Sequence, residues 1–177
     1  VERLLECEEI DVNLQNNDGW TALIIASSHK SLSVVNRLLD CNEIKVNLQN
    51  KDGDNALLVS FSFGRLSVAN RLLDCEEIDV NLQDKRGWTA LMSALYTGQL
   101  KMVNQILDCK KIDVNLQNIN GDTALMCAAK NGLLCMVYRL LACNEIKVNL
   151  SNNKGLTALT HATYNGHPDV VIKLLKC

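Results

Sequence analysis

Eight cysteines are the residues of this sequence with the most obvious chemistry. Six of them follow one another at intervals of 34 residues: Cys7, Cys41, Cys75, Cys109, Cys143 and Cys177. Thiols can form disulfides or bind zinc, but a disulfide needs Cα atoms closer than about 7 Å, whereas equivalent residues in stacked helices are about 8–10 Å apart. Zinc sites use clustered ligands such as C-x-x-C, which the sequence lacks. We therefore expect the first five to be small buried residues, Cys177 to be more exposed, and the protein to occupy a reducing, cytoplasmic location.

Histidines and catalytic motifs offer little further chemistry. A nucleophile pair of His161 with Cys135 or Cys143 would lack a third group to orient it, and we interpret His167 as structural. The patterns G-x-x-x-x-G-K-[ST], H-E-x-x-H and G-x-S-x-G are all absent. We therefore predict that the protein is not an enzyme and uses neither a cofactor nor a metal.

Composition narrows the class of protein. The chain of 177 residues carries 18 Lys and Arg against 20 Asp and Glu, a net charge of −2, and 47% of its residues are hydrophobic. This balance predicts a folded chain and argues against a nucleic-acid partner, which would favour a strongly basic surface. The apolar runs are far shorter than the roughly 18 residues that a membrane span requires. The first residue is Val1 rather than Met, so we expect a segment of a longer polypeptide.

The elements that must position any functional side chain are organised by a repeat of 34 residues. Besides the cysteines, Gly19, Gly53, Gly87, Gly121 and Gly155 share this interval, as do Asn13, Asn47, Asn81, Asn115 and Asn149, each within a V-N-L tripeptide. Such a period indicates stacked supersecondary units. We predict a single array over residues 1–177, with a partial repeat 1–14, repeats 15–48, 49–82, 83–116 and 117–150, and a truncated repeat 151–177.

Each repeat has the same internal order of signals. A Thr, or Asn55 in one repeat, precedes apolar residues at helical spacing and predicts the start of a short helix A. A glycine ends it in four repeats, whereas Lys30 stands there in the first full repeat and predicts either local strain or a different turn. A second helix, B, follows with paired apolar residues such as Val34 and Val35, and Pro168 starts it in the last repeat. The alternation of Ile44, Val46 and Leu48 with polar residues then predicts an extended arm that reverses at an Asp-Gly turn.

The combination G-x-T-A-L-x-x-A, then G, V-V-x-x-L-L and D-V-N resembles the ankyrin repeat across all 177 residues. The resemblance implies an all-α solenoid of stacked helix-turn-helix units joined by hairpin loops. The family's Pro before the Leu is Ala here, as at Ala22, and the period exceeds the usual value of about 33 by one residue. The added residue falls after helix B.

The resemblance further implies that a partner protein is bound by the hairpin tips and by the helix A ends that face a groove. Transferred to this chain, the candidate binding residues are Trp20, Asp54, Phe63, Lys85, Arg86, Trp88, Tyr96, Asp122, Lys130 and Tyr164. Five of the seven aromatic residues fall on this edge, and exposed aromatic residues often dominate binding energy at interfaces. We expect the strongest contributions from Trp88, Tyr96 and Arg86, with Phe63 beside them.

The sequence is also compatible with other interpretations. Trp20 and Trp88 could simply cover the neighbouring hairpin. Lys85, Arg86 and Lys130 could instead serve a sensor of small phosphorylated ligands or oligonucleotides, which would bind in a salt-dependent way. A third alternative is a structural tether within a longer protein whose exposed ends self-associate or stack on further repeats. The resemblance also implies that the V-N-L asparagines could be hydroxylated, although we expect them to bond the loop backbone.

Overall fold

The computed structural model describes residues 10–177, so predictions that concern residues 1–9, including Cys7, lie outside the described part. Within it, the regular secondary structure is helical, which confirms the all-α prediction. Helices A are α2 (Ala22–Ser28), α4 (Ala56–Ser62), α6 (Ala90–Tyr96), α8 (Ala124–Lys130) and α10 (Ala158–Tyr164). Helices B are α3 (Leu32–Leu39), α5 (Leu66–Leu73), α7 (Leu100–Leu107), α9 (Leu134–Leu141) and α11 (Pro168–Leu174). Successive helices A therefore begin 34 residues apart.

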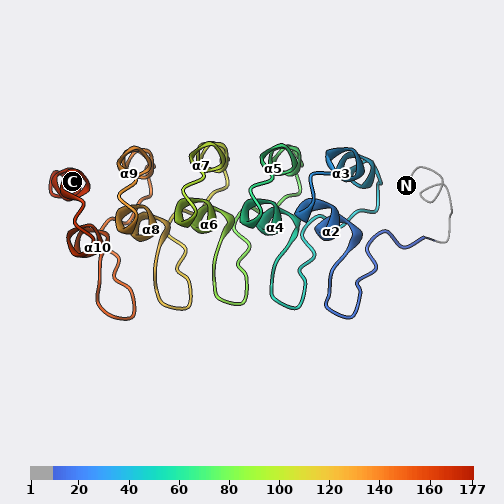
Figure 1. Ribbon diagram of the computed structural model, residues 1–177, viewed down its shortest axis with the longest axis horizontal. Coiled ribbons are helices and arrows are strands. Elements are labelled where there is room, and N and C mark those ends of the chain that lie inside the picture. Colours follow the sequence, from blue (N-terminus) through green and yellow to red (C-terminus); the bar gives the residue numbers. More distant parts are fainter. Residues whose placement is uncertain (1–9) are drawn as a thin grey trace. The chain divides into compact units, whose positions relative to one another are not determined.

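The described chain forms two compact units, one ending at Lys85 and the other spanning Arg86–Cys177. In the first, α2 packs against α4 and α3 against α5; in the second, α8 packs against both α6 and α10, and α9 against both α7 and α11. Within each unit, helices A and helices B form two layers, and hairpin loops extend from the side of helices A (Figure 1). Buried residues such as Leu57 and Phe61 in the first unit, and Leu91 and Leu125 in the second, fill the space between neighbouring helices.

The predicted caps form at both ends of helix A. The Thr89 hydroxyl oxygen accepts a hydrogen bond from the backbone N–H of Met92, and Asn55 caps α4 in the same way through its side-chain oxygen. At the other end of α4, Gly64 has φ of +63° and the following Arg65 N–H donates to the Ser60 carbonyl at 2.8 Å. This is the backbone arrangement that a left-handed glycine permits after a helix.

Of the two alternatives expected at Lys30, local strain or a different turn at the end of helix α2, the structure shows the different turn. Positive φ values in the described chain occur only at glycines, so Lys30 does not adopt the left-handed conformation. Instead, the chain leaves α2 at His29 in an extended conformation, and the His29 N–H donates to Ala26. A side chain at this position is therefore accommodated by opening the turn rather than by backbone strain.

The prediction of an extended arm after helix B is wrong. The chain there makes consecutive turns, in which the Ile44 N–H donates to Cys41 and the Leu48 N–H donates to Lys45. In other repeats, an aspartate side chain accepts from the N–H two residues later, as Asp113 does from Asn115. These local bonds compete with extended structure. The alternation of apolar and polar residues still predicts part of the burial in this loop, since Val46 is buried.

The prediction that the repeated cysteines are buried is also wrong for the described members. Cys41, Cys75, Cys109 and Cys143 are only half-buried. Each lies just after helix B, where its Sγ donates weakly to the carbonyl four residues earlier, as in Cys143 to Arg139 at 3.6 Å. The chain has left helix B at this point, so the thiol is less completely covered than side chains within the helix layer. Cys177 is exposed, as expected, and the seven described cysteines are all free.

Thiol reactivity provides a test of the packing of α8. The pKa of Cys127 is raised to about 12, chiefly by burial and also by the nearby Asp122 carboxylate, although Lys130 lowers it. At pH 8 only about 10⁻⁴ of Cys127 is thiolate, so iodoacetamide should modify the exposed Cys135 at least about tenfold faster. Peptide mass spectrometry measures both rates, and denatured protein serves as the control in which the two should react alike. Similar rates in the native protein would contradict the buried environment.

Candidate interaction surface

Hairpin loops present most of the predicted binding residues, and asparagine side chains shape their tips. The Asn50 Oδ1 accepts from the backbone N–H groups of Asp52 and Asp54, both at 2.9 Å. Asn118 makes the equivalent bonds to Asn120 and Asp122. The tip backbone is thus closed by its own side chain, as in an Asx turn.

Successive hairpins within each unit are joined by backbone hydrogen bonds. The Lys51 N–H donates to Asp18 at 2.9 Å in the first unit, and the Ile119 N–H donates to Arg86 at 2.9 Å in the second. A glutamine reinforces this ladder, since the Gln49 side-chain amide donates to the carbonyl of Gln83 at 2.9 Å and to that of Gly53. The tips therefore form an ordered row rather than independent loops.

The V-N-L asparagines join the loop that follows one helix B to the equivalent loop of the next repeat. The Asn47 Nδ2 donates to the Glu77 carbonyl at 2.7 Å, and its Oδ1 accepts from the Asp79 N–H at 2.9 Å. Asn115 bonds Glu145 and Lys147 in the same way. These contacts confirm the expected structural role of the amide for both asparagines.

In the first unit, the predicted binding residues lie on hairpin tips and at the end of α4. Phe63 is 53% exposed, and the Arg65 guanidinium lies 5.9 Å from its ring centre. Lys85 is exposed, while Trp20 and Asp54 are half-buried. An exposed ring beside a cation is a suitable contact for a partner, because it offers both apolar area and charge.

In the second unit, the structure brings two predicted residues together. The Trp88 and Tyr96 rings are 5.3 Å apart with an interplanar angle of 79°, an edge-to-face arrangement. Trp88 is half-buried and Tyr96 is 57% exposed. Arg86 and Lys130 are exposed, and Tyr164 at the end of α10 is 90% exposed. Sequence spacing placed both rings on one edge but gave no signal that they touch.

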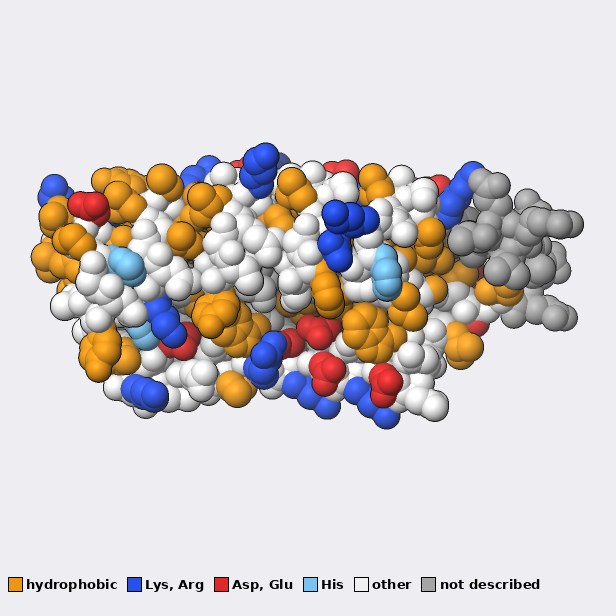
Figure 2. Space-filling view, in the orientation of Figure 1, with side chains coloured by type: hydrophobic (Ala, Val, Ile, Leu, Met, Phe, Trp, Pro, Cys, Tyr) orange, Lys and Arg blue, Asp and Glu red, His pale blue; other side chains and the backbone are white. Residues whose placement is uncertain are grey.

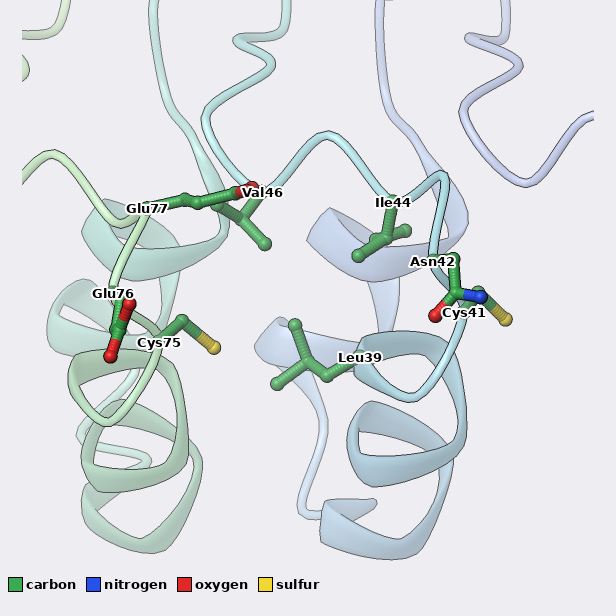
Figure 3. A pocket seen from close by; sticks show the side chains of 8 residues that line it. All are labelled: Leu39, Cys41, Asn42, Ile44, Val46, Cys75, Glu76 and Glu77. Atoms are coloured by element: carbon green, nitrogen blue, oxygen red, sulfur yellow. The ribbon is translucent and has the colours of Figure 1, made fainter.

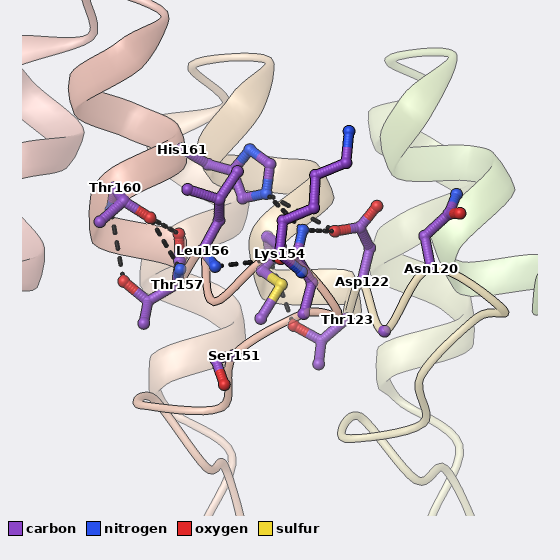
Figure 4. A network of polar contacts seen from close by, with 12 residues as sticks. Asn120, Asp122, Thr123, Ser151, Lys154, Leu156, Thr157, Thr160 and His161 are labelled. Atoms are coloured by element: carbon purple, nitrogen blue, oxygen red, sulfur yellow. Dashed lines mark hydrogen bonds and ion pairs between the residues drawn. The ribbon is translucent and has the colours of Figure 1, made fainter.

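Asp122 is engaged inside the chain rather than presented alone to a partner. Its Oδ1 accepts from the Asn152 Nδ2 at 2.7 Å and lies 3.5 Å from the His161 Nε2 (Figure 4). The His161 side chain is only 12% exposed. The network joins two successive repeats, so we assign Asp122 and His161 a structural role there. His167 is also structural, since its Nε2 lies 3.0 Å from the Lys130 carbonyl oxygen.

The division into two units reveals a charge asymmetry that the net charge conceals. Residues 1–85 carry 15 Asp and Glu against 8 Lys and Arg, a charge of −7, whereas residues 86–177 carry 5 against 10, a charge of +5. In Figure 2, hydrophobic side chains reach the surface among these charged groups. The two units therefore carry net charges of opposite sign.

Residues 10–177 contain neither a cluster of metal-binding side chains nor a helix that could span a membrane. No group of three or more His, Cys, Asp and Glu side chains in that range could hold a metal ion. None of the helices found there has the length and apolarity needed to cross a bilayer.

A comparison of the hairpin glycine Gly87 with Gly98, which follows helix α6, tests how closely the hairpins stack. Gly87 and Gly98 both have positive φ, but a Cβ at Gly87 would lie 2.7 Å from the Asn118 Cα, whereas one at Gly98 would meet nothing within 4 Å. Gly98→Ala should lower the free energy of unfolding by about 1–2 kcal/mol through backbone strain, and Gly87→Ala by roughly 1–3 kcal/mol more because the hairpins must separate. Urea unfolding followed by circular dichroism measures both. Equal losses would show that the hairpins do not constrain each other.

Comparison with known proteins agrees with this geometry. The family model for ankyrin repeats in three copies matches residues 1–50, 30–118 and 106–177. None of the curated proteins compared with the chain matches it. Because the matched ranges together cover the chain, and because its described helices repeat in the same order, the protein belongs to the ankyrin-repeat family.

Proposed function

We propose that this chain is a non-catalytic module that binds a partner protein through its hairpin tips and the ends of helices A. Ankyrin repeats generally mediate binding to other proteins. The observation that carries the proposal here is the Trp88–Tyr96 pair, which combines a half-buried ring with a largely exposed one.

The pair is suited to binding because it is already ordered. Trp88 follows a hairpin tip that is bonded to the next hairpin through Arg86 and Ile119, and Tyr96 ends helix α6. An aromatic residue held in place loses little conformational freedom when a partner covers it. Such residues therefore contribute more of the binding energy than flexible ones.

Charge favours a partner segment that is acidic where it meets the second unit. Arg86 and Lys130 are exposed candidates for contacting it, and residues 86–177 carry an excess of five positive charges. The same charge supports the second candidate, a sensor of phosphorylated ligands or oligonucleotides. The two candidates differ in the salt dependence of binding. Affinity for an oligonucleotide should fall steeply as the salt concentration rises, because the release of counterions from the oligonucleotide then becomes less favourable.

The test is an affinity capture from the source cell, followed by titration of the identified partner against variants. Trp88→Ala and Tyr96→Ala should each weaken binding by about 30-fold, the effect of losing an interface hot spot. Tyr138→Ala is the matched control, because Tyr138 is 53% exposed in the same unit but lies on helix B α9. Circular dichroism checks that each variant folds. Affinity that is unchanged in both edge variants, or reduced equally in the control, would remove the assignment.

A further inference from the structure

A pocket in the first unit lies away from the hairpin tips, at the ends of helices B. It is lined by Leu39, Cys41, Asn42, Ile44, Val46, Cys75, Glu76 and Glu77, with a volume of about 300 Å³. Leu39 ends α3, and the other residues belong to the loops that follow α3 and α5. This volume is at the lower end of the range for small-molecule sites, so the pocket suits one extended side chain better than a large cofactor.

The inner wall of the pocket is formed by apolar side chains and by Cys75, whose Sγ accepts a weak hydrogen bond from the Arg71 guanidinium at 3.6 Å. In Figure 3, the Cys75 Sγ points toward Leu39, and Ile44 and Val46 line the adjoining wall. Burial raises the pKa of the Cys75 thiol; Arg71 lowers it, whereas Asp74 and Glu77 raise it. The thiol is therefore neutral at physiological pH and adds to the apolar surface.

The rim of the pocket is acidic. Glu76 and Glu77 are both exposed, and in the view of Figure 3 the Glu77 side chain extends in the direction of Val46. The backbone of Glu77 is held in place, since its carbonyl accepts the hydrogen bond from the Asn47 amide at 2.7 Å. The surrounding unit carries a charge of −7, so the field at this rim attracts cations.

The repeat itself shows that the acidic rim is not required for stacking. One repeat later the apolar wall positions are still Leu73, Ile78 and Val80, and two repeats later Leu107, Ile112 and Val114. The positions of Glu76 and Glu77, in contrast, become Lys110 and Lys111 and then Asn144 and Glu145. Glu8 and Glu9 hold the same positions at the start of the sequence, so the paired carboxylates occur in some repeats only, whereas the apolar wall is found in each of these repeats.

We propose that this pocket binds a Lys or Arg side chain from a basic segment of a partner protein. The aliphatic stem would lie along Leu39, Ile44 and Val46, and the charged group would reach the carboxylates of Glu76 and Glu77. Long cationic side chains commonly divide in this way between apolar and polar surroundings, and guanidinium groups pair well with carboxylates. The site is separate from the Trp88–Tyr96 surface, so its failure would leave the proposed function of that surface intact.

The experiment is a titration of the ¹⁵N-labelled chain with n-butylguanidinium, a mimic of the arginine side chain, followed by NMR of the backbone amides. We expect saturable shifts at Ile44, Val46 and Cys75. The uncharged n-butylurea has a similar shape and should give no saturable shift there. Equal binding of the two probes, or guanidinium shifts scattered over the acidic loops instead, would overturn the proposal.

Matched variants distinguish binding in the pocket from a nonspecific attraction of the cation to the acidic first unit. Glu76→Gln with Glu77→Gln should weaken n-butylguanidinium binding by about fivefold or more, since two exposed ion pairs are lost. Glu77→Gln alone is compared with Glu43→Gln, which removes an equal charge from an exposed loop residue that does not line the pocket. If Glu43→Gln weakens binding as much as Glu77→Gln, the attraction is nonspecific and the proposed site is wrong.

Discussion

Close contact between successive hairpins is the constraint on which the structure of each unit depends. Helices of seven or eight residues are too short to be stable alone, so each repeat must be held by its neighbours. The hairpins supply directional bonds, such as that from the Lys51 N–H to Asp18, and they approach so closely that a side-chain carbon at Gly53 would lie 2.7 Å from the next backbone. Glycine is therefore required there for space as well as for its positive φ.

The same constraint decides which side chains are left for binding. Asparagine and glutamine residues of the loops, such as Asn47 and Gln49, are used in bonds to the neighbouring repeat. Variation is tolerated at the tips and at the ends of helices A, and there the exposed aromatic residues Phe63, Tyr96 and Tyr164 are found. The rigid ladder beneath them lowers the entropy cost of presenting these rings to a partner.

Charge distinguishes the two units more than their fold does. A net charge of −2 results from an acidic first part and a basic second part. The acidic part contains the pocket edged by Glu76 and Glu77, and the basic part contains the Trp88–Tyr96 pair. One repeating backbone thus carries two surfaces of different chemistry, because solvent-facing positions change without affecting the stacking.

The sequence by itself determined the helices, the residues that cap helices A and the departure from the repeat at Lys30, because these depend on bonds within a few residues and on a fixed period of 34. It also identified the edge on which Trp88 and Tyr96 lie. Only the tertiary structure decided that the loop after helix B folds into turns, that Cys75 and its equivalents are half-buried, that the two rings touch, and that a pocket opens beside Glu77. The exposed fraction of a side chain and its contacts depend on how the neighbouring repeat packs against it. The spacing of residues within one repeat does not specify that packing.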